Sequence, residues 1–385
     1  MKGSSPLRLA LALCTITTAV NLQAPLYDAL AARDGLGVGA TSVAFACYVL
    51  GIMPVLLALN GLPERLGRRP LILAALCLCL VATSMTLLAP GLVTLGIARF
   101  LMGLGTALTS AVAPAYMLEL FHDRDKRVAA NWVTGSTSLG FGLGAAVTSL
   151  FVLYTPSLTP PSLWLYLGAA SLALLLVIGL PDDAPRQRHA AMLRLPAYPA
   201  GALPFGLAIL LAWATVGLVI AILPSTLARH GLAAWSGFAT FGICSCGVLF
   251  QPWARQLSPH ASTQLGLIIL PLAYALIAWG SLNGVLAAVL IGTLAASSAC
   301  YGFVYLGGLS GVLAVAGERQ SSASAGFFLL AYVGFSLPVV TTGALIDSVG
   351  HAIALPLFGG ALCVGALVVS WLLRTASAQS AEAQL

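Results

Sequence analysis

The chain has 385 residues, of which 59% are hydrophobic and 7% are charged, and its formal net charge is +6. Soluble domains carry about 25% charged residues, so this composition excludes an ordinary soluble protein and indicates a polytopic membrane protein. The basic residues are dispersed among short segments and form no aromatic-interleaved patch, which argues against a nucleic-acid-binding protein.

Twelve apolar stretches are long enough to cross a bilayer, because a membrane helix needs about 20 such residues. The first is read as a span, since it is too long for the apolar region of a cleavable signal peptide. The sequence therefore predicts an all-α polytopic membrane protein with twelve transmembrane helices. The predicted spans are 7–31, 38–60, 71–89, 92–119, 128–154 and 162–180, then 202–228, 233–254, 261–281, 284–312, 321–346 and 351–373.

Basic residues gather on one side of these spans. Under the positive-inside rule, this side is the cytoplasm and both termini lie there, in the cell (inner) membrane. Arg33 and Arg229 fall outside, and Arg99 lies within a span. The cytoplasmic segments hold the other 14 of the 17 basic residues: Lys2, Arg8, Arg65, Arg68, Arg69, Arg124, Lys126, Arg127, Arg186, Arg188, Arg194, Arg255, Arg319 and Arg374.

The two halves of the chain resemble each other. An offset of 194 residues places Gly140 over Gly334 and brings the loops of one half over those of the other. The predicted domains are an N-terminal six-helix bundle (1–181), a cytoplasmic connector (182–201), a C-terminal six-helix bundle (202–374) and a tail (375–385).

A charged turn, Asn60-Gly-Leu-Pro-Glu-Arg-Leu-Gly-Arg-Arg-Pro70, separates the second and third spans. It resembles the signature that major facilitator superfamily transporters carry at this place, with Asn60 instead of the first Gly and Glu64 instead of Asp. The run Leu95 to Gly105, which contains Arg99, is similar to the fourth-helix motif of the same superfamily. The resemblance is to the twelve-helix drug and metabolite proton antiporters. It implies two pseudo-symmetric bundles, a substrate site between them and a monomer.

The resemblance also implies a charge relay that latches the inner face, made of Glu64, Arg68 and Glu119. The alternative is that these are solvated loop charges which obey only the sidedness rule. The residues expected at the inner gate are Gly61, Glu64, Arg65, Gly67, Arg68, Arg69 and Glu119.

Arg99 needs a partner, because an intramembrane arginine costs at least a few kcal/mol unless it is paired or hydrated. Asp28 lies on the same predicted face of the first span as Thr18 and Asn21, at a depth about 6 Å from that of Arg99. We expect an ion pair between Asp28 and Arg99, and in the related antiporters the arginine of this motif is associated with proton coupling. The alternative is that Asp28 ends the helix among headgroups while Arg99 binds backbone carbonyls.

Gly140 and Gly144 lie in a glycine-rich run of the fifth span and are expected to permit close helix packing. The run resembles the antiporter signature of drug exporters, in which Pro stands at the position of Ala145.

Polar and aromatic residues within the spans are candidates for the substrate cavity. No acidic residue lies near mid-membrane in either half, so a neutral or amphipathic organic solute fits better than a strong cation. The candidates are Asn21, Gln23, Thr106, Tyr116, Asn131, Trp213, Tyr301, Tyr305 and Tyr332, each of which has an alternative role in packing or at the membrane interface.

Metal, cofactor and enzyme chemistry have no support in the sequence. The eight cysteines lie within apolar segments without a CxxC spacing, the five histidines are dispersed, and no nucleotide-binding motif is present. We therefore expect no metal, no cofactor and no enzymatic activity.

The predicted function is secondary export of a small organic drug or metabolite by alternating access, coupled to proton antiport. The partners are the solute, protons and the lipid bilayer. Two alternatives remain: uptake or facilitated diffusion of a neutral or amphipathic solute, and a membrane sensor or scaffold that does not transport.

Overall fold

The structure, a computed structural model, describes residues 5–58, 62–121, 126–182 and 195–382. All regular secondary structure among the described residues is helical, and these residues contain no strand. They include twelve helices or helix runs that are long and apolar enough to cross a membrane, which confirms the predicted fold class. By their contacts, these elements form two compact units, residues 1–36 with 43–194 and residues 37–42 with 195–385.

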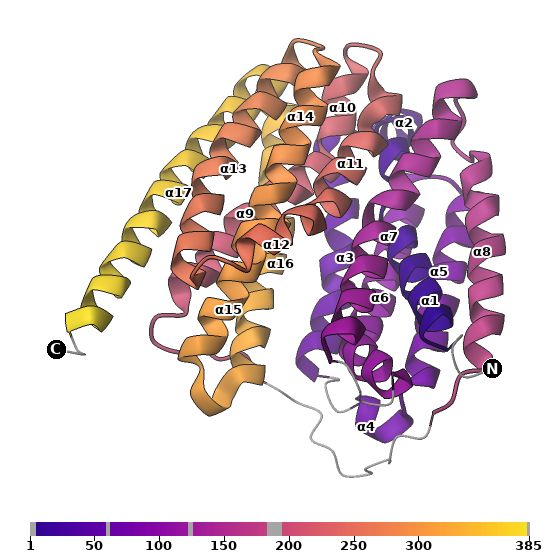
Figure 1. Cartoon of the computed structure of the whole chain (residues 1–385). Coiled ribbons are helices and arrows are strands. Elements are labelled where there is room, and N and C mark those ends of the chain that lie inside the picture. The colour runs from indigo at the N-terminus through magenta and orange to yellow at the C-terminus, as the bar shows by residue number, and fades with distance from the viewer. Residues whose placement is uncertain (1–4, 59–61, 122–125, 183–194, 383–385) are drawn as a thin grey trace. The chain divides into compact units, whose positions relative to one another are not determined.

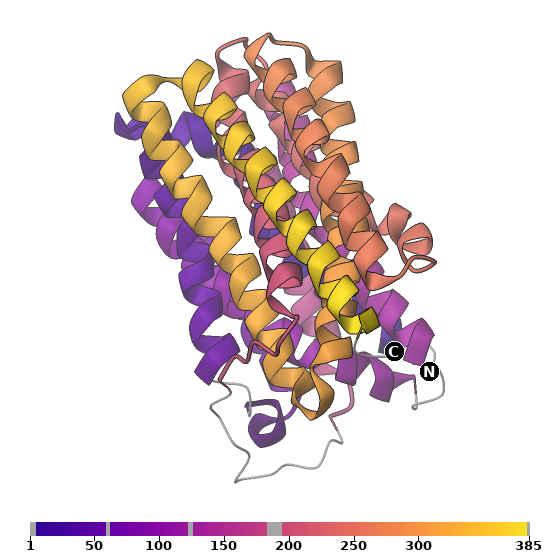
Figure 2. The ribbon, with the colours of Figure 1, turned by 90° about the vertical axis from the view of Figure 1, so that its left-hand side faces the viewer.

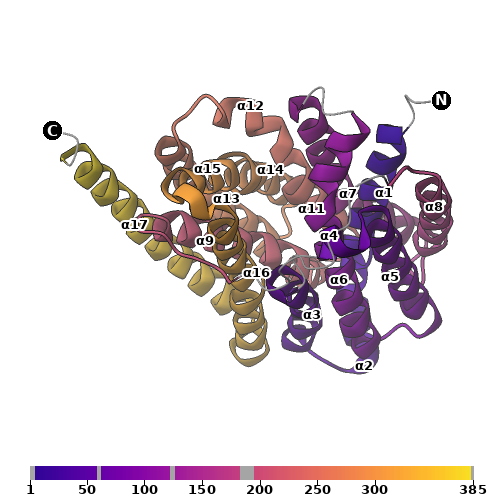
Figure 3. The same ribbon diagram turned by 90° about the horizontal axis from the view of Figure 1, so that it is seen from below.

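Unit 1 holds the first six spans, drawn in indigo to magenta in Figure 1. Within it, α1 pairs closely with α7, α5 pairs with α6, and α8 lies against both α1 and α5, as the end-on view in Figure 3 shows. Its elements are α1 (Ser5–Asn21), η2 (Ala24–Leu26), α2 (Tyr27–Asp34), α3 (Val38–Ala58), α4 (Leu62–Leu66), α5 (Arg69–Leu88), α6 (Leu92–Leu120), α7 (Lys126–Tyr154) and α8 (Pro161–Ile178).

Unit 2 holds the other six spans. There α9 pairs closely with α16, α13 packs on α14, and α17 crosses the face of the unit next to α13 and α9 (Figure 2). Its elements are α9 (Leu203–Ala221), α10 (Leu223–Ala228), η3 (Ala233–Trp235), α11 (Ser236–Ser245), η4 (Cys246–Phe250), α12 (Gln251–Ala254), α13 (Pro259–Leu282), α14 (Leu286–Ser297), the π-helix η5 (Ser298–Val304), α15 (Tyr305–Val315), η6 (Gly317–Arg319), α16 (Gln320–Val349) and α17 (His351–Glu382).

Glycines bring the closest helix pair of each unit into backbone contact. A Cβ on Gly140 would overlap Thr17 and the Cys14 carbonyl of α1, and a Cβ on Gly144 would overlap the Thr18 carbonyl. In unit 2, a Cβ on Gly334 of α16 would likewise overlap the Leu210 carbonyl of α9. Gly140 and Gly334 therefore make equivalent contacts in the two units, as the offset of 194 residues predicts.

The first span is not the single straight helix that the sequence predicts. α1 ends at Asn21, a 3-10 turn with Pro25 follows, and α2 begins at Tyr27. Proline has no N–H to continue the α-helical ladder, so the chain is redirected here. The break changes the direction in which Asp28 projects.

Candidate functional site

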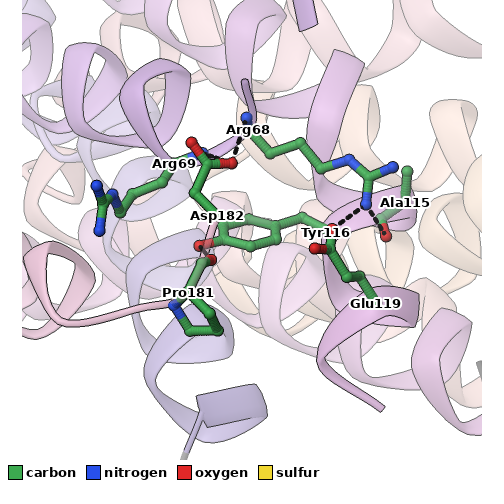
Figure 4. A network of polar contacts seen from close by, with 7 residues as sticks. All are labelled: Arg68, Arg69, Ala115, Tyr116, Glu119, Pro181 and Asp182. Atoms are coloured by element: carbon green, nitrogen blue, oxygen red, sulfur yellow. Dashed lines mark hydrogen bonds and ion pairs between the residues drawn. The ribbon is translucent and has the colours of Figure 1, made fainter. Parts of the chain in front are cut away.

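The charged turn folds around a carboxylate that follows the sixth span. The Arg68 N–H donates to Asp182 Oδ1 at 3.0 Å, and the Arg69 N–H lies 3.5 Å from the same oxygen (Figure 4). These amides begin α5, so the negative charge lies where the helix dipole favours it. Gly67 has a φ of +90°, and a Cβ there would be 2.6 Å from Asp182 Oδ2. Both facts require glycine at position 67.

The Arg68 side chain joins this turn to α6. Its guanidinium forms an ion pair with Glu119 and donates from Nη1 to the Ala115 carbonyl at 3.0 Å (Figure 4). Both charged side chains are about one quarter exposed, at 26% and 28%. The Arg68 to Glu119 part of the expected relay is thus in contact.

Glu64 takes no part in this contact. It is exposed on α4, and no hydrogen bond or ion pair joins it to another residue of the described chain. Arg65 is also exposed on α4, whereas Gly61 lies outside the described residues.

Two further contacts connect the end of α8 to the turn. Arg69 Nη1 donates to the carbonyls of Leu180 at 3.0 Å and Ile178 at 3.2 Å. The Tyr116 hydroxyl donates to the Pro181 carbonyl at 2.7 Å (Figure 4). Together with the bonds of Arg68 and Asp182, they tie α5, α6 and α8 at one end of unit 1. We call this set of contacts the inner network.

Tyr116, a substrate candidate from the sequence, is thus part of the inner network. Its side chain is fully buried and its hydroxyl is bound to backbone. Asp182 was not among the candidates from the sequence. Its position directly after a span, on the same predicted side of the membrane as the charged turn, is a signal that could have suggested it.

Arg99 lies inside unit 1 with no exposed surface. Its Nη1 donates to the Val20 carbonyl of α1, and Nε lies 3.4 Å from the Phe45 carbonyl of α3. The guanidinium carbon is 4.6 Å from the Phe45 ring centroid and 4.7 Å from that of Tyr48. Nη2 has no hydrogen-bond partner among the described residues. Arg99 thus joins α1, α3 and α6 through carbonyls and ring faces.

The expected ion pair between Asp28 and Arg99 is not formed. Asp28 is half-buried in the first turn of α2, and no ion pair or hydrogen bond joins its side chain to Arg99. The prediction assumed that the first span is one straight helix, and the turn at Pro25 breaks this register. Arg99 instead binds backbone carbonyls, as the alternative reading of the sequence held.

Unit 2 contains an aromatic group on three elements. Trp213 of α9 lies 5.2 Å from Tyr332 and 5.8 Å from Phe335 of α16, and 6.4 Å from Tyr301 of the π-helix η5, measured between ring centroids. Trp213, Tyr301 and Tyr332 are each half-buried. These four residues are called the aromatic cluster. Three of them are substrate candidates from the sequence, and the structure brings these three together.

Tyr305 begins α15 directly after the π-helix and contacts other rings. It lies 6.5 Å from Phe327 and 6.3 Å from Phe328, measured between ring centroids. The Cys300 thiol, beside Tyr301, lies 3.3 Å from the Ala212 carbonyl and ties the π-helix to α9.

The remaining substrate candidates lie in unit 1. Asn21 donates to the Phe141 carbonyl at 2.8 Å, and Gln23 donates to Thr86 Oγ1 at 2.7 Å; both are buried. Thr106 bonds back to the Met102 carbonyl of its own helix at 2.8 Å. Asn131 is exposed on α7.

Metal ligands are not grouped in the part of the chain that the structure describes. No set of three His, Cys, Asp or Glu side chains there is placed to hold a metal ion, and the eight cysteines are unbridged.

A sequence model of the Major Facilitator Superfamily matches residues 9–338. The chain belongs to the major facilitator superfamily. Solved structures show the same fold: a mutant of the nucleoside transporter NupG has a TM-score of 0.78 at 12% identity, covering 95% of this chain and 99% of NupG. A POT family transporter in complex with 5-aminolevulinic acid has a TM-score of 0.72 at 14% identity, covering 97% of this chain and 96% of that chain.

This major facilitator protein also resembles an uncharacterized transporter of Rickettsia bellii (strain RML369-C), with 26% identity over 111 residues. The match spans 28% of each chain. Membership of the superfamily indicates a multi-pass membrane transporter of some substrate.

Proposed function

We propose that this protein is a secondary transporter that exports a small organic compound by alternating access, coupled to proton antiport. The excess of basic residues on one side of the spans supports both termini being in the cytoplasm, and the superfamily resemblance supports a monomer. The domain limits proposed from the sequence follow from the same topology, with the connector on the cytoplasmic side.

Arg99 is the single observation that carries the proposal of proton coupling. A charge with no exposed surface, held by two carbonyls and two ring faces, has no neutralising carboxylate in contact. Such groups are expensive in a membrane and mark ion or proton pathways. Asp28 is a half-buried carboxyl in the first turn of α2, in the first span. We assign proton uptake and release to Asp28 and its control to Arg99.

The inner network is proposed to be the base of the cytoplasmic gate. Its contacts hold the start of α5 and the ends of α6 and α8 in one arrangement. The charged turn is therefore proposed to move together with these helix ends as one rigid unit. Glu64 and Arg65, exposed beside it, and Gly61 complete the proposed gate.

The aromatic cluster supports an uncharged, partly aromatic solute. The helical segments around it, α9, η5 and the middle of α16, contain no Asp, Glu, Lys or Arg, so a formal charge on the solute would find no counter-charge there. Aromatic rings favour offset-stacked or edge-to-face partners, which a planar solute supplies. Asn21, Gln23, Thr106 and Asn131 are proposed as further polar contacts of the solute.

A ligand screen tests the substrate assignment. Purified protein is heated with uncharged aromatic solutes, nucleosides among them, and with matched aliphatic and cationic compounds. A ligand that binds the folded state raises its melting temperature. We expect aromatic neutral compounds to stabilise the wild type, and Trp213→Phe to weaken that effect.

The matched control is Trp371→Phe, because Trp371 is 63% exposed on α17 and lies outside the cluster. Stabilisation that is equal in the two variants would refute the role of the cluster. Uptake or facilitated diffusion remains the second candidate, and the same ligand, once identified, separates it from export by the dependence of flux on a pH gradient. A sensor or scaffold would bind the ligand without flux.

A further inference from the structure

An apolar groove opens between three helices of unit 2, and we call it the side groove. Thirteen residues line it, within 210–214 of α9, 337–345 of α16 and 354–362 of α17. All of them lie in unit 2, where α16 and α17, orange and yellow in Figure 2, run side by side. The groove has a volume of about 420 Å³, within the range of about 300–1,000 Å³ that is typical of ligand sites. It is therefore large enough to hold a ligand.

The described residues of the lining leave no polar side chain for a ligand. None is charged, and the hydroxyl groups are those of Thr341 and Thr342. Thr341 donates to the Leu337 and Pro338 carbonyls, both at 3.0 Å. Thr342 donates to the Pro338 carbonyl at 2.7 Å, so both hydroxyls are used within α16. Sites for polar solutes carry a few placed polar groups that orient the ligand, whereas this lining suits a hydrocarbon.

The side groove opens toward lipid. Its three helices are among the candidate membrane spans. On its walls, Leu337 of α16 is 60% exposed and Leu357 of α17 is 55% exposed. Large apolar side chains that are exposed within a span lie in the hydrocarbon core of the bilayer. Acyl chains of lipids are therefore the molecules that surround the groove.

The length of the groove is close to the depth of one leaflet. From Ala354 to Leu362, its lining follows α17 over eight residues, which is about 12 Å at 1.5 Å per residue. The hydrocarbon core is about 30 Å thick, so each leaflet contributes about 15 Å. The lining begins three residues after His351, the first residue of the span. In the proposed topology, the groove therefore lies in the outer leaflet.

Tyr274 of α13 fixes the α17 wall from behind. Its side chain is buried, and its hydroxyl donates to the Leu355 carbonyl at 2.9 Å. Its ring centroid lies 5.0 Å from that of Phe358, which lines the groove. A Cβ on Gly359 would be 3.0 Å from the same tyrosine ring. These contacts anchor α17 to α13, so the groove does not close by a shift of α17 toward α16.

Both ends of the groove are closed by the fold. At the outer end, α16 and α17 are joined through Gly350, which has a φ of +81°. At the inner end, a Cβ on Gly365 of α17 would be 2.9 Å from Leu211 of α9, which itself lines the groove. A ligand therefore enters from the side, directly from the bilayer.

The lining is small for a protein partner, a second copy of this chain included. Thirteen residues form it, whereas a stable protein–protein interface uses about 20–30 residues on each side. A single acyl chain needs neither an interface of that size nor a polar contact. It is the occupant that fits the size, the chemistry and the place of the groove.

We propose that the side groove binds one acyl chain of an outer-leaflet phospholipid, as a lipid that the protein retains. The fixed walls give this chain more van der Waals contacts than the lipid around the protein provides. Trp213 precedes the lining residue Ala214 on α9, so the chain supports a helix of the aromatic cluster. The choice of leaflet rests on the proposed topology, whereas the binding itself goes beyond the proposed function and requires no transport.

Native mass spectrometry of the full chain tests the binding. The protein is stripped of lipid in detergent and titrated with phosphatidylethanolamine. The obstructing variant is Ala361→Phe, because Ala361 is an exposed lining residue of α17 and a phenyl ring there occupies the groove. We expect one tightly bound phospholipid per wild-type chain. The variant should bind it about tenfold more weakly, since the ring displaces part of the buried acyl chain.

Ala352→Phe is the matched control. Ala352 is also exposed on α17 but lies outside the groove, so this variant should bind phospholipid as the wild type does. Thr341→Val tests the chemistry of the lining and should likewise match the wild type, because the Thr341 hydroxyl is used within α16. Melting temperatures measured without lipid show whether each variant is folded.

Photolabelling in nanodiscs locates the chain. A phospholipid with a diazirine on one acyl chain is incorporated, and its adducts are mapped by peptide mass spectrometry after illumination. When a large excess of ordinary phospholipid is added shortly before illumination, adducts at Leu337 and Leu357 should persist. Those at Leu367, which is 72% exposed on α17 outside the groove, should disappear.

Equal phospholipid affinity in Ala361→Phe and Ala352→Phe would overturn the proposal. Adducts that disappear from the groove as fast as from Leu367 would also overturn it, since the lipid there would then be ordinary surrounding lipid. Detergent retained in place of phospholipid would mean that the groove holds an adventitious additive only. Neither readout depends on solute flux, so a failure of the transport assay counts against the proposed function alone.

Discussion

Replacing Arg99 by leucine and by lysine tests how a buried charge is held in unit 1. Leucine removes the charge and retains much of the apolar stem, whereas lysine retains the charge and loses the planar fork. Conventional similarity ranks lysine as the milder change. The contacts of Arg99 predict the opposite order.

The magnitudes follow from its contacts. Two bonds from a charged donor contribute about 1.5–3 kcal/mol each, and the faces of Phe45 and Tyr48 add about 1 kcal/mol each. Burying the ion opposes this with a desolvation cost of several kcal/mol, and Nη2 has no partner in the described chain to offset its share. Arg99→Leu removes the favourable contacts of the guanidinium together with the desolvation cost of its charge. It should therefore change the free energy of unfolding by less than about 2 kcal/mol.

Lysine keeps the desolvation cost without the bonds. An ammonium cannot reach the Val20 and Phe45 carbonyls together and stack between two rings. Arg99→Lys should therefore lower the free energy of unfolding by about 3 kcal/mol, the cost of a buried charge that has lost its partners.

The assay is unfolding of the purified protein by SDS, followed by loss of helical circular dichroism. Arg255→Lys serves as the control, because Arg255 is exposed and makes one long bond, 3.5 Å to Gln251. A leucine variant less stable than the lysine variant would show that the charge is a net source of stability, contrary to this reasoning. Arg99→Ala is further expected to insert normally and to lose proton-coupled flux.

The other predictions concern the inner network and helix packing. Gly67→Ala should destabilise the protein by about 1–2 kcal/mol or more, because φ is +90° and the methyl group meets Asp182; thermal melting measures this. Glu119→Gln should change the melting temperature little, since an ion pair with about one quarter exposure contributes at most about 1 kcal/mol; a large loss would mean that the pair is better shielded than its exposure implies. Gly144→Leu should prevent folding of unit 1, because α1 backbone occupies the space, whereas Gly168→Leu, with nothing within 4 Å, should fold; expression and monodispersity after size-exclusion chromatography distinguish the two.

The spans were predictable because the bilayer requires apolar side chains along the whole length of a membrane helix, and because arginines gather in the segments between spans. Close helix packing at Gly140 and Gly144 was predictable from the spacing of these glycines, but the helix that they contact was not. Small residues at helix spacing have few uses other than close contact.

Tertiary contacts with no local signal were not predictable. Pro25 is visible in the sequence, but the direction of the chain after it is not, so the Asp28 to Arg99 pair was wrong. The π-helix η5 contains no proline that could have indicated it, and it packs against η4, where a Cβ on Gly302 would be 3.0 Å from the Phe250 Cβ. Asp182 accepts a hydrogen bond from the Arg68 amide, 114 positions away in the sequence, and only the fold brings the two together.

Flux in proteoliposomes with and without a pH gradient tests the central claim most directly. Vesicles are loaded with the compound that the ligand screen identifies, and the release of the compound and the pH of the lumen are recorded together. The account predicts that solute and protons move in opposite directions and that collapsing the gradient slows solute flux. Solute flux that is unchanged after the gradient is collapsed, with no movement of protons, would contradict it.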